Sequence, residues 1–336
     1  MRHLPALLLA SALFCLACGP AEAPETAPDA AAGTIRIATW NVENWRDHFD
    51  AWRRRRQRAR DEAEARQKQI EAFQNDEDNW EIAQVLLDPE FAPDIVVVQE
   101  GCAQEELEQF NREWLGGAFA TLRVLPSNDE RGQTLAILLR EGFEIVEIDA
   151  DHHRLPDPDD LNPRSDRLFA RGPAFVLVQT PSGNRLWVGT NHQKSKAGED
   201  GLADTRWRNA EALATRRIIQ DLAARSDGAA GVVFLGDLND QLGIQAWELE
   251  GGGDTVANLV GPPEAGLELA TRKLAEEGVA SYMGYWRPTY RGLIDHIVIT
   301  QDLAPSVGQV AVFDSAWARV ASDHLPVYID LRLDGD

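Results

Sequence analysis

The sequence predicts an α/β protein built as a four-layer sandwich, in which two packed mixed β-sheets are flanked by helices. Three observations support this fold class. Short strand-like runs recur along most of the chain and are separated by Gly, Pro and Asn turns. Amphipathic stretches lie between only some of these runs, which favours two packed sheets over one doubly wound sheet. Hydrophobic residues make up 44% of the 336 residues, which is enough for a large core.

The predicted strands are of two kinds. Residues 34–40 (TIRIATW) alternate between apolar and polar side chains, whereas residues 94–99 (DIVVVQ) form the continuous apolar run that is typical of a strand buried on both faces. The other runs predicted to be strands are 133–140, 143–149, 173–180, 185–191, 231–236, 293–300, 308–313 and 326–333. Helices are predicted for 46–74, 105–115 and 202–225, which are amphipathic or rich in helix formers.

Residues 1–18 resemble a bacterial export signal. Arg2 precedes an apolar run that is too short to be a permanent membrane span, and the run ends at small residues and Cys18. The letters CLAC before Gly19 resemble a lipoprotein cleavage box, in which the cysteine is lipidated; ordinary secretion with cleavage nearby is the alternative. We therefore expect an exported protein, either a lipoprotein of the periplasm or outer membrane or a secreted one. Residues 19–33 are predicted to be a disordered tether of Ala, Pro and acidic residues.

Charge and cysteine content limit the partners. The net charge is −22, so the surface would repel nucleic acid unless basic side chains or a bound cation reverse the sign locally. With Cys18 acylated and Cys15 removed, Cys102 would be the one free thiol, which excludes a disulfide framework and fits a small buried residue. No other segment is apolar enough to span a bilayer, and no obligate protein partner is evident.

Polar side chains gather where the predicted strands end. Each acid among them lies against apolar sequence, where a lone carboxylate would be costly to desolvate, so several together indicate a shared cation. Oxygen ligands suit Mg²⁺, Mn²⁺ or Ca²⁺, and after the predicted export signal the sequence contains no CxxC or HExxH pattern that would indicate zinc. The residues concerned are Asn41, Glu43, Glu100, Asn191, His192, Asp237, Asn239, Asp295, His296, Asp323 and His324.

These motifs follow the order N-x-[ED], QE, H, GD-x-N, DH and SDH between residues 39 and 327, and they resemble the endonuclease/exonuclease/phosphatase superfamily. That superfamily comprises metal-dependent phosphoesterases, among them pancreatic-type DNases, abasic-site endonucleases, sphingomyelinases and inositol polyphosphate phosphatases. The resemblance implies a catalytic domain over residues 34–334 with the family's four-layer sandwich. The helix-rich stretch at about residues 46–80 would be an insertion in this domain.

For the metal, the resemblance implies that Glu100 is the main ligand, with Glu43 and Asp323 close to the same ion or to a second one. Asn41 and Asn239 would hold phosphate oxygens or orient neighbouring groups. The expected ion is Mg²⁺, with Mn²⁺ or Ca²⁺ as alternatives. Bound there, it would neutralise the charge that develops during in-line attack of water on phosphorus.

For the protons, the resemblance implies that Asp237 positions or deprotonates the attacking water. His324 would touch the phosphate and act as a general base, with Asp295 behind it fixing its tautomer. His192 matches the position of the histidine that protonates the leaving oxygen in DNase-like members.

The motifs constrain the substrate less than the chemistry. The stretches TWNVENW, NHQKSK and SYMGYWRPTYRGLIDHI look most like secreted bacterial nucleases, and Lys194 and Lys196 would then supply positive charge near the phosphate. The alternatives are a phospholipid or small-molecule phosphodiesterase or phosphatase, similar to sphingomyelinases, and a non-catalytic surface lipoprotein that binds a ligand. The arginine-rich run at 52–60 fits either a phosphate-binding helix face or a solvated helix with local ion pairs.

Overall fold

The computed structural model describes residues 33–45, 78–129, 132–157, 159–163, 165–196, 201–225, 228–243, 246–284 and 291–333. The predicted export signal, nearly all of the predicted tether, the predicted helix at 46–74 and the arginine-rich run at 52–60 lie outside these residues. Of the predicted insertion only 78–80 is described, and it belongs to a helix that continues to residue 86.

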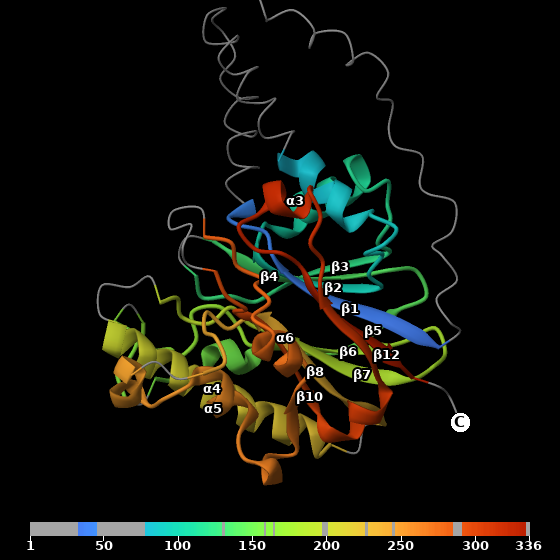
Figure 1. The fold of residues 1–336 in the computed structure, drawn as a ribbon. Coiled ribbons are helices and arrows are strands. Elements are labelled where there is room, and N and C mark those ends of the chain that lie inside the picture. The colour runs from blue at the N-terminus through green and yellow to red at the C-terminus, as the bar shows by residue number, and fades with distance from the viewer. Residues whose placement is uncertain are drawn as a thin grey trace, which may run out of the picture.

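The strands form two six-stranded sheets that pack face to face, as the sequence predicts (Figure 1). In spatial order the first sheet contains β11 (Val307–Val312), β12 (Val327–Arg332), β1 (Thr34–Asn41), β2 (Ile95–Gly101), β4 (Thr134–Leu139) and β3 (Thr121–Leu125). The second contains β5 (Glu144–Asp149), β6 (Ala174–Gln179), β7 (Arg185–Thr190), β8 (Ala229–Asp237), β10 (Asp295–Thr300) and β9 (Leu267–Leu269). Both sheets are mixed, because β1–β2 and β7–β8 are parallel pairs whereas their neighbours are antiparallel.

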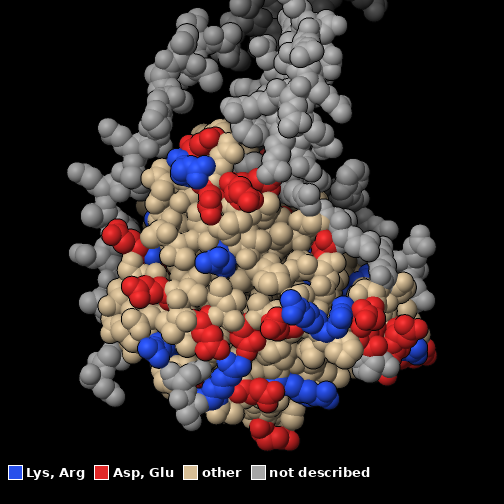
Figure 2. Space-filling model, turned by 180° about the vertical axis from the view of Figure 1, so that it is seen from behind, with Lys and Arg blue, Asp and Glu red and all other residues tan. Residues whose placement is uncertain are grey.

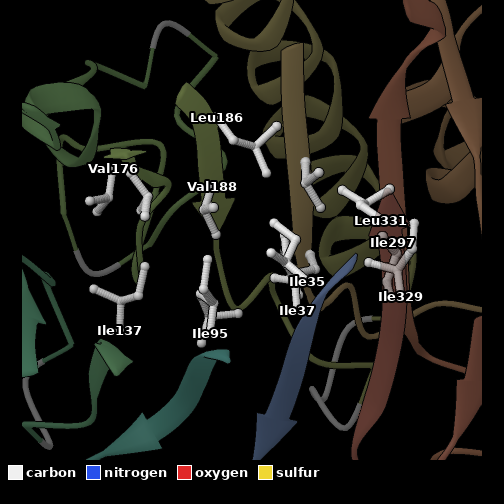
Figure 3. Close-up of a cluster of buried hydrophobic side chains, with 14 of the residues drawn as sticks. Ile35, Ile37, Ile95, Ile137, Val176, Leu186, Val188, Ile297, Ile329 and Leu331 are labelled. Carbon is white, nitrogen blue, oxygen red and sulfur yellow. The ribbon is translucent and has the colours of Figure 1, made fainter. Parts of the chain in front are cut away.

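The two sheets share a hydrophobic interface. Alternate residues of each strand face it, so that Ile35 and Ile37 of β1 belong to the same cluster as Val188 of β7 (Figure 3). The residues between them face the other way, and Trp40 packs among side chains of the helices. The central strands are therefore buried on both faces, which explains the continuous apolar run at 94–99.

Helices and short turns connect the strands. The helices are α3 (Gln104–Glu113), α4 (Gly201–Ala223), α5 (Thr255–Val260), α6 (Arg272–Glu276) and α7 (Ala318–Ala321). The 3₁₀ helices are η1 (Asp151–Arg154), η2 (Ala246–Gly251), η3 (Pro263–Ala265) and η4 (Gln301–Ser306).

Most of these helices form the two outer layers of the sandwich (Figure 1), whereas α6 and η4 pack against the core between the sheets. The helix that ends at residue 86, together with α3 and α7, packs on the first sheet. There Phe110 of α3 meets Trp45 edge to face, with ring centroids 4.7 Å apart. On the second sheet, α4 and α5 pack through apolar residues such as Ile219 and Leu259. Each sheet thus has one face on its partner sheet and one on helices.

Every run predicted as a strand corresponds to a strand of the structure and differs from it only at the ends. The predicted helices at 105–115 and 202–225 correspond to α3 and α4. The sequence pattern does not predict β3 or β9. β9 has only 3 residues, and β3 is an edge strand interrupted by the exposed Arg123, so neither forms a clear apolar run.

Two further expectations concern burial and membrane insertion. The side chain of Cys102 is buried, as predicted. Among the helices of the described ranges, none is both long and apolar enough to span a bilayer.

The strand ends bring polar residues together at one edge of the sandwich. Asn41 ends β1 and Asp237 ends β8, and Nδ2 of Asn41 donates to Oδ2 of Asp237 at 3.0 Å. The ends of the two parallel pairs therefore meet. Near the end of β2, Gln99 accepts a hydrogen bond from Thr39 of β1 at 3.1 Å and donates one to Thr190 of β7 at 3.0 Å. This buried polar bridge links the two sheets next to the meeting point.

Candidate active site

Asp237, the last residue of β8, lies at the centre of the converging residues and is buried. Besides the bond from Asn41, its Oδ2 lies 3.2 Å from Nε2 of His192 and 3.8 Å from Nε2 of His324. Its Oδ1 accepts the backbone N–H of Asn239 at 2.8 Å. Burial would raise the pKa of Asp237, but the two histidines and the hydrogen bonds bring it below its usual value. The group is therefore an anion in this site.

His324 is held at its Nδ1 atom by a chain of hydrogen bonds. Nδ1 lies 2.8 Å from Oδ2 of Asp295, and the same oxygen accepts a hydrogen bond from the hydroxyl of Ser281 at 2.6 Å. The ring of Tyr282 packs on the imidazole with centroids 5.0 Å apart. Burial would lower the pKa of His324, but Asp295 and Asp237 raise it to about 10. The ring is therefore protonated at neutral pH and carries an N–H at Nε2.

Glu100 reaches the site because β2 is distorted there. Strict alternation would place its side chain on the helix-covered face with the neighbouring valines. The pairing of β2 with β4 shifts register between Val98 and Gly101, and Glu100 has a left-handed backbone with φ of 56°. Its Oε1 then lies 3.9 Å from Nε2 of His192, and its Oε2 accepts from Nε2 of Gln133 at 2.8 Å.

Glu43 and Asp323 meet from opposite ends of the chain. Glu43 has a left-handed backbone with φ of 46°, and its Oε2 accepts the backbone N–H of Asp323 at 3.1 Å. Burial raises the pKa of Asp323 to about 7, and the carboxylates of Glu43, Glu100 and Asp237 add to the rise although His324 opposes it. This end of the site is thus crowded with carboxylate oxygens.

The two lysines that the sequence places near the phosphate are engaged elsewhere. Nζ of Lys194 lies 2.8 Å from Oδ1 of Asp204. Nζ of Lys196 contacts the carboxylates of Asp240 and Glu248. Both ammonium groups are therefore bound to carboxylates outside the group around Asp237. The structure brings the other predicted residues together: Asn41, Glu43, Glu100, His192, Asp237, Asn239, Asp295, Asp323 and His324.

A comparison with protein-family models gives a match to this chain. The endonuclease/exonuclease/phosphatase family matches this chain over residues 38–324, a range that includes every residue of the converging group. The chain belongs to this family. A comparison with curated proteins gives no match.

Solved structures of endonuclease/exonuclease/phosphatase proteins share the fold. One from Beutenbergia cavernae DSM 12333 has a TM-score of 0.59 at 19% identity, covering 90% of this chain and 72% of that one. D. rerio TDP2, complexed with single strand DNA product, has a TM-score of 0.54 at 18% identity, covering 88% and 98%. The human Nocturnin catalytic domain with bound sulfate has a TM-score of 0.54 at 16% identity, covering 89% and 94%. At these identities the likeness shows the fold alone.

Members of the endonuclease/exonuclease/phosphatase family are typically dependent on a divalent metal, and the donors in this chain fit a hard ion. Asp237, Asp295 and His324 offer ligand atoms within 4.8 Å of one another and could hold one. In that group, however, Nδ1 of His324 is already hydrogen-bonded to Asp295. The crowded oxygens of Glu43, Glu100 and Asp323 form a second set, the one expected from the sequence.

The sequence motifs assign no role to three further residues of the site, Ser281, Gln133 and Arg171, although Ser281 begins the SYMGYWRPTYRGLIDHI stretch and Arg171 shortly precedes the strand predicted at 173–180. Besides binding Glu100, Gln133 lies 3.4 Å from Nη1 of Arg171, whose Nη2 donates to the carbonyl of Gln193 at 2.9 Å. Gln133 and Arg171 lie shortly before β4 and β6, strands antiparallel to the parallel pairs, so they start at the edge where the site lies. A polar residue shortly before such a strand is the sequence signal that points to both.

Proposed function

We propose that the chain is a divalent-metal-dependent phosphodiesterase that cleaves nucleic acid by in-line attack of water on phosphorus. The observation that carries this proposal is the convergence on Asp237. Asn41, His192 and His324 come from three separate segments and both sheets, and each has a nitrogen within 3.8 Å of one carboxylate oxygen. A buried carboxylate is suited to orient water, and the two imidazoles beside it are suited to hold an anionic substrate.

Each residue around the phosphate has its own task in this proposal. Asp237 accepts a hydrogen bond from the attacking water and takes its proton. His324 donates from Nε2 to a phosphate oxygen, while Asp295 fixes the ring through the 2.8 Å bond to Nδ1. Because Asp295 favours the protonated ring, His324 suits this cationic role better than that of general base. His192 protonates the leaving oxygen, and Asn41 holds Asp237 in place.

The ion would be held by Glu100, with Glu43 and Asp323 beside it. When bound, it supplies Lewis-acid stabilisation of the charge that develops on the phosphoryl oxygens. Mg²⁺ is the first choice, because it commonly uses one or two carboxylates and completes its shell with water and phosphate. Asn239 would contact a phosphate oxygen from the loop after β8.

Nucleic acid as the substrate is supported by the motifs that resemble secreted nucleases and by the shared fold with D. rerio TDP2, which was solved with single strand DNA product. A small phosphoester, such as a phospholipid head group, is the second candidate. The charge distribution favours it: the net charge is −22. On the face seen in Figure 2, basic side chains are scattered among acidic ones without a continuous stripe over the described residues. A long polyanion gains little affinity from such a surface.

A substrate panel tests the proposal. The purified chain is assayed on DNA, RNA, sphingomyelin and a small phosphomonoester, each with Mg²⁺, Mn²⁺ or Ca²⁺ and with a chelator control. We expect metal-dependent cleavage of DNA or RNA. Turnover confined to sphingomyelin or the monoester would move the assignment to the second candidate. No metal-dependent hydrolysis of any substrate would indicate a non-catalytic binding protein.

We also propose that the protein is exported and that Cys18 is lipidated, which would make this anchor its only link to the membrane. The support is the apolar run of residues 1–18, which ends in CLAC before Gly19. Labelled palmitate fed to expressing cells should enter the wild-type protein but not the Cys18→Ser variant. Equal labelling of both would contradict lipidation, and unprocessed protein retained in the cytoplasm would contradict export.

A further inference from the structure

A buried charge cluster lies behind the site, between α4 and the loops that follow β7 and β8. It comprises Lys196, Arg208, Asp240 and Glu248, and the last three are fully buried. Nζ of Lys196 contacts the carboxylate of Asp240 and lies 2.8 Å from Oε1 of Glu248. Nε of Arg208 lies 3.6 Å from the other oxygen of Asp240. Two cations and two anions therefore compensate one another, and of the four only the Lys196 side chain, which is 21% exposed, reaches water.

This buried charge cluster joins the two loops that carry catalytic side chains. Lys196 follows His192 in the loop after β7, and Asp240 directly follows Asn239 in the loop after β8. A contact between Lys196 and Asp240 is thus a contact between the two loops. Glu248, the second partner of Lys196, lies in η2 and supports the pair from a third segment.

Other contacts bind the same two loops. The N–H of Gln193 donates to the carbonyl of Asp237 at 2.9 Å, and the carbonyl of Gln193 accepts from Nδ2 of Asn239 at 3.0 Å. Nε2 of the buried His296 lies 3.1 Å from the carbonyl of Asp240. These contacts and the contact between Lys196 and Asp240 therefore act together to hold the loop after β7 against the loop after β8.

Lys196 cannot turn toward a substrate without breaking this arrangement. Its departure would remove one cation from the two fully buried carboxylates of Asp240 and Glu248, and of the two cations of the cluster only Arg208 would remain. A buried ion pair that loses one partner leaves an uncompensated charge, which is strongly unfavourable. Burial would lower the pKa of Lys196, but Asp240 and Glu248 raise it above its usual value, so the ammonium stays charged where it is.

We propose that Lys196 is a positioning residue: by binding Asp240 and Glu248 it helps the backbone contacts to fix the loop after β7 against the loop after β8, and so helps to maintain the 3.2 Å separation between His192 and Asp237. This inference rests on the proposed hydrolysis at the site. It assigns Lys196 a task different from the phosphate contact predicted from the NHQKSK stretch.

Kinetics and binding of the Lys196→Met variant separate the two roles. A positioning role predicts that kcat on a DNA oligonucleotide falls by about 100-fold. Binding of the oligonucleotide in chelator, and its dependence on salt, stay unchanged. A phosphate contact would instead lower the salt slope by about 0.7 to 0.9 and leave kcat near wild type. That second result would overturn the inference. Lys273→Met, at a lysine with 83% of its side chain exposed, is the matched control and should change neither quantity.

A second measurement does not depend on activity. A double-mutant cycle combines Lys196→Met with Asp240→Asn and is followed by thermal unfolding. The effects of the two substitutions on stability should be strongly non-additive, and additive effects would contradict a contact between Lys196 and Asp240 that joins the loops. A crystal structure of the Lys196→Met variant should show His192 and Asp237 farther apart than 3.2 Å, and an unchanged separation would refute positioning. If Lys196→Met does not fold, the shape-conserving Glu248→Gln, which removes the charge of one carboxylate partner of Lys196, takes its place in the kcat measurement and in the crystal structure. If the wild-type protein hydrolyses no substrate, the proposed function is wrong. The double-mutant cycle and the crystal structure of the Lys196→Met variant would still show whether Lys196 positions the loop after β7.

Discussion

Asp237 and Asp295 face each other in register on the antiparallel strands β8 and β10, and the imidazole of His324 lies against both carboxylates. Oδ2 of Asp237 lies 3.8 Å from Nε2 of the ring, and Oδ2 of Asp295 lies 2.8 Å from Nδ1. Register pairing therefore sets the geometry of the site. The two acids differ in task because they meet opposite nitrogens of the same ring.

Replacing Asp295 by Asn keeps the shape of the side chain but removes the charge that holds His324. The wild-type kcat for hydrolysis should fall by about 10²–10⁴-fold, because the ring loses its orientation and its proton. Steady-state kinetics of Asp295→Asn measure this, with the exposed Asp302→Asn as the control. A kcat within a few-fold of wild type would show that the pair is not used in catalysis.

Ser281 should matter through Asp295. Ser281→Ala removes the 2.6 Å hydrogen bond to Oδ2 of a buried carboxylate, so the free energy of unfolding should drop by about 1.5–3 kcal/mol. We expect kcat to fall about tenfold as His324 is held less firmly. Denaturant titration and kinetics of this variant check both values, and a loss of stability with unchanged kcat would restrict Ser281 to a structural role.

Glu100→Gln distinguishes the two sets of metal donors. If Glu100 is the main ligand, this variant should bind Mg²⁺ or Mn²⁺ more weakly by more than about 100-fold and lose hydrolysis. Asp295→Asn should bind the ion almost as the wild type does. Calorimetric titration of both variants measures the affinities, and circular dichroism checks the fold. The reverse order of affinities would place the ion at Asp237, Asp295 and His324.

Gly236 permits the close approach of β7 and β8 at the site. A Cβ at this position would lie 2.3 Å from the backbone oxygen of Asn191, so Gly236→Ala should push the strand ends apart. We expect a loss of about 1–3 kcal/mol in the free energy of unfolding and a kcat lowered in parallel, because His192 moves away from Asp237. Gly308→Ala, where the nearest atom is 3.3 Å away, is the milder control. Equal effects of the two substitutions would contradict this reason for the glycine.

Glu211 gives a pH dependence of stability. Burial raises the pKa of Glu211 from 4.5 to about 7, although the N–H of Lys194 and nearby cations oppose the rise. The folded state therefore keeps this proton to higher pH than the unfolded state, and stability falls as the pH rises through that window. Glu211→Gln should remove the fall and be more stable than wild type above pH 7 by on the order of 3 kcal/mol. Denaturant titrations from about pH 5 to about pH 8 test this, and a difference that is constant with pH would contradict it.

The strands can be predicted from the sequence because burial on two faces imposes long apolar runs. The polar residues that follow these runs mark the ends of the strands. The four-layer fold and the grouping of Asn41, Asp237 and His324 could therefore be predicted. The orientation of Glu100 depends on a bulge and on a left-handed backbone, which no local pattern encodes. The direction of Lys196 could not be foreseen either, since its partners Asp240 and Glu248 are recognisable as buried only once α4 and η2 are in place.

The pairing of the first and last strands has a consequence for biosynthesis. β1 is hydrogen-bonded to β12 from Thr34 opposite Arg332 onward, and His324 stands just before β12. A chain still emerging from the ribosome therefore lacks the imidazole that completes the site. The proposed hydrolysis therefore requires that translation has passed His324 and that β12 has paired with β1.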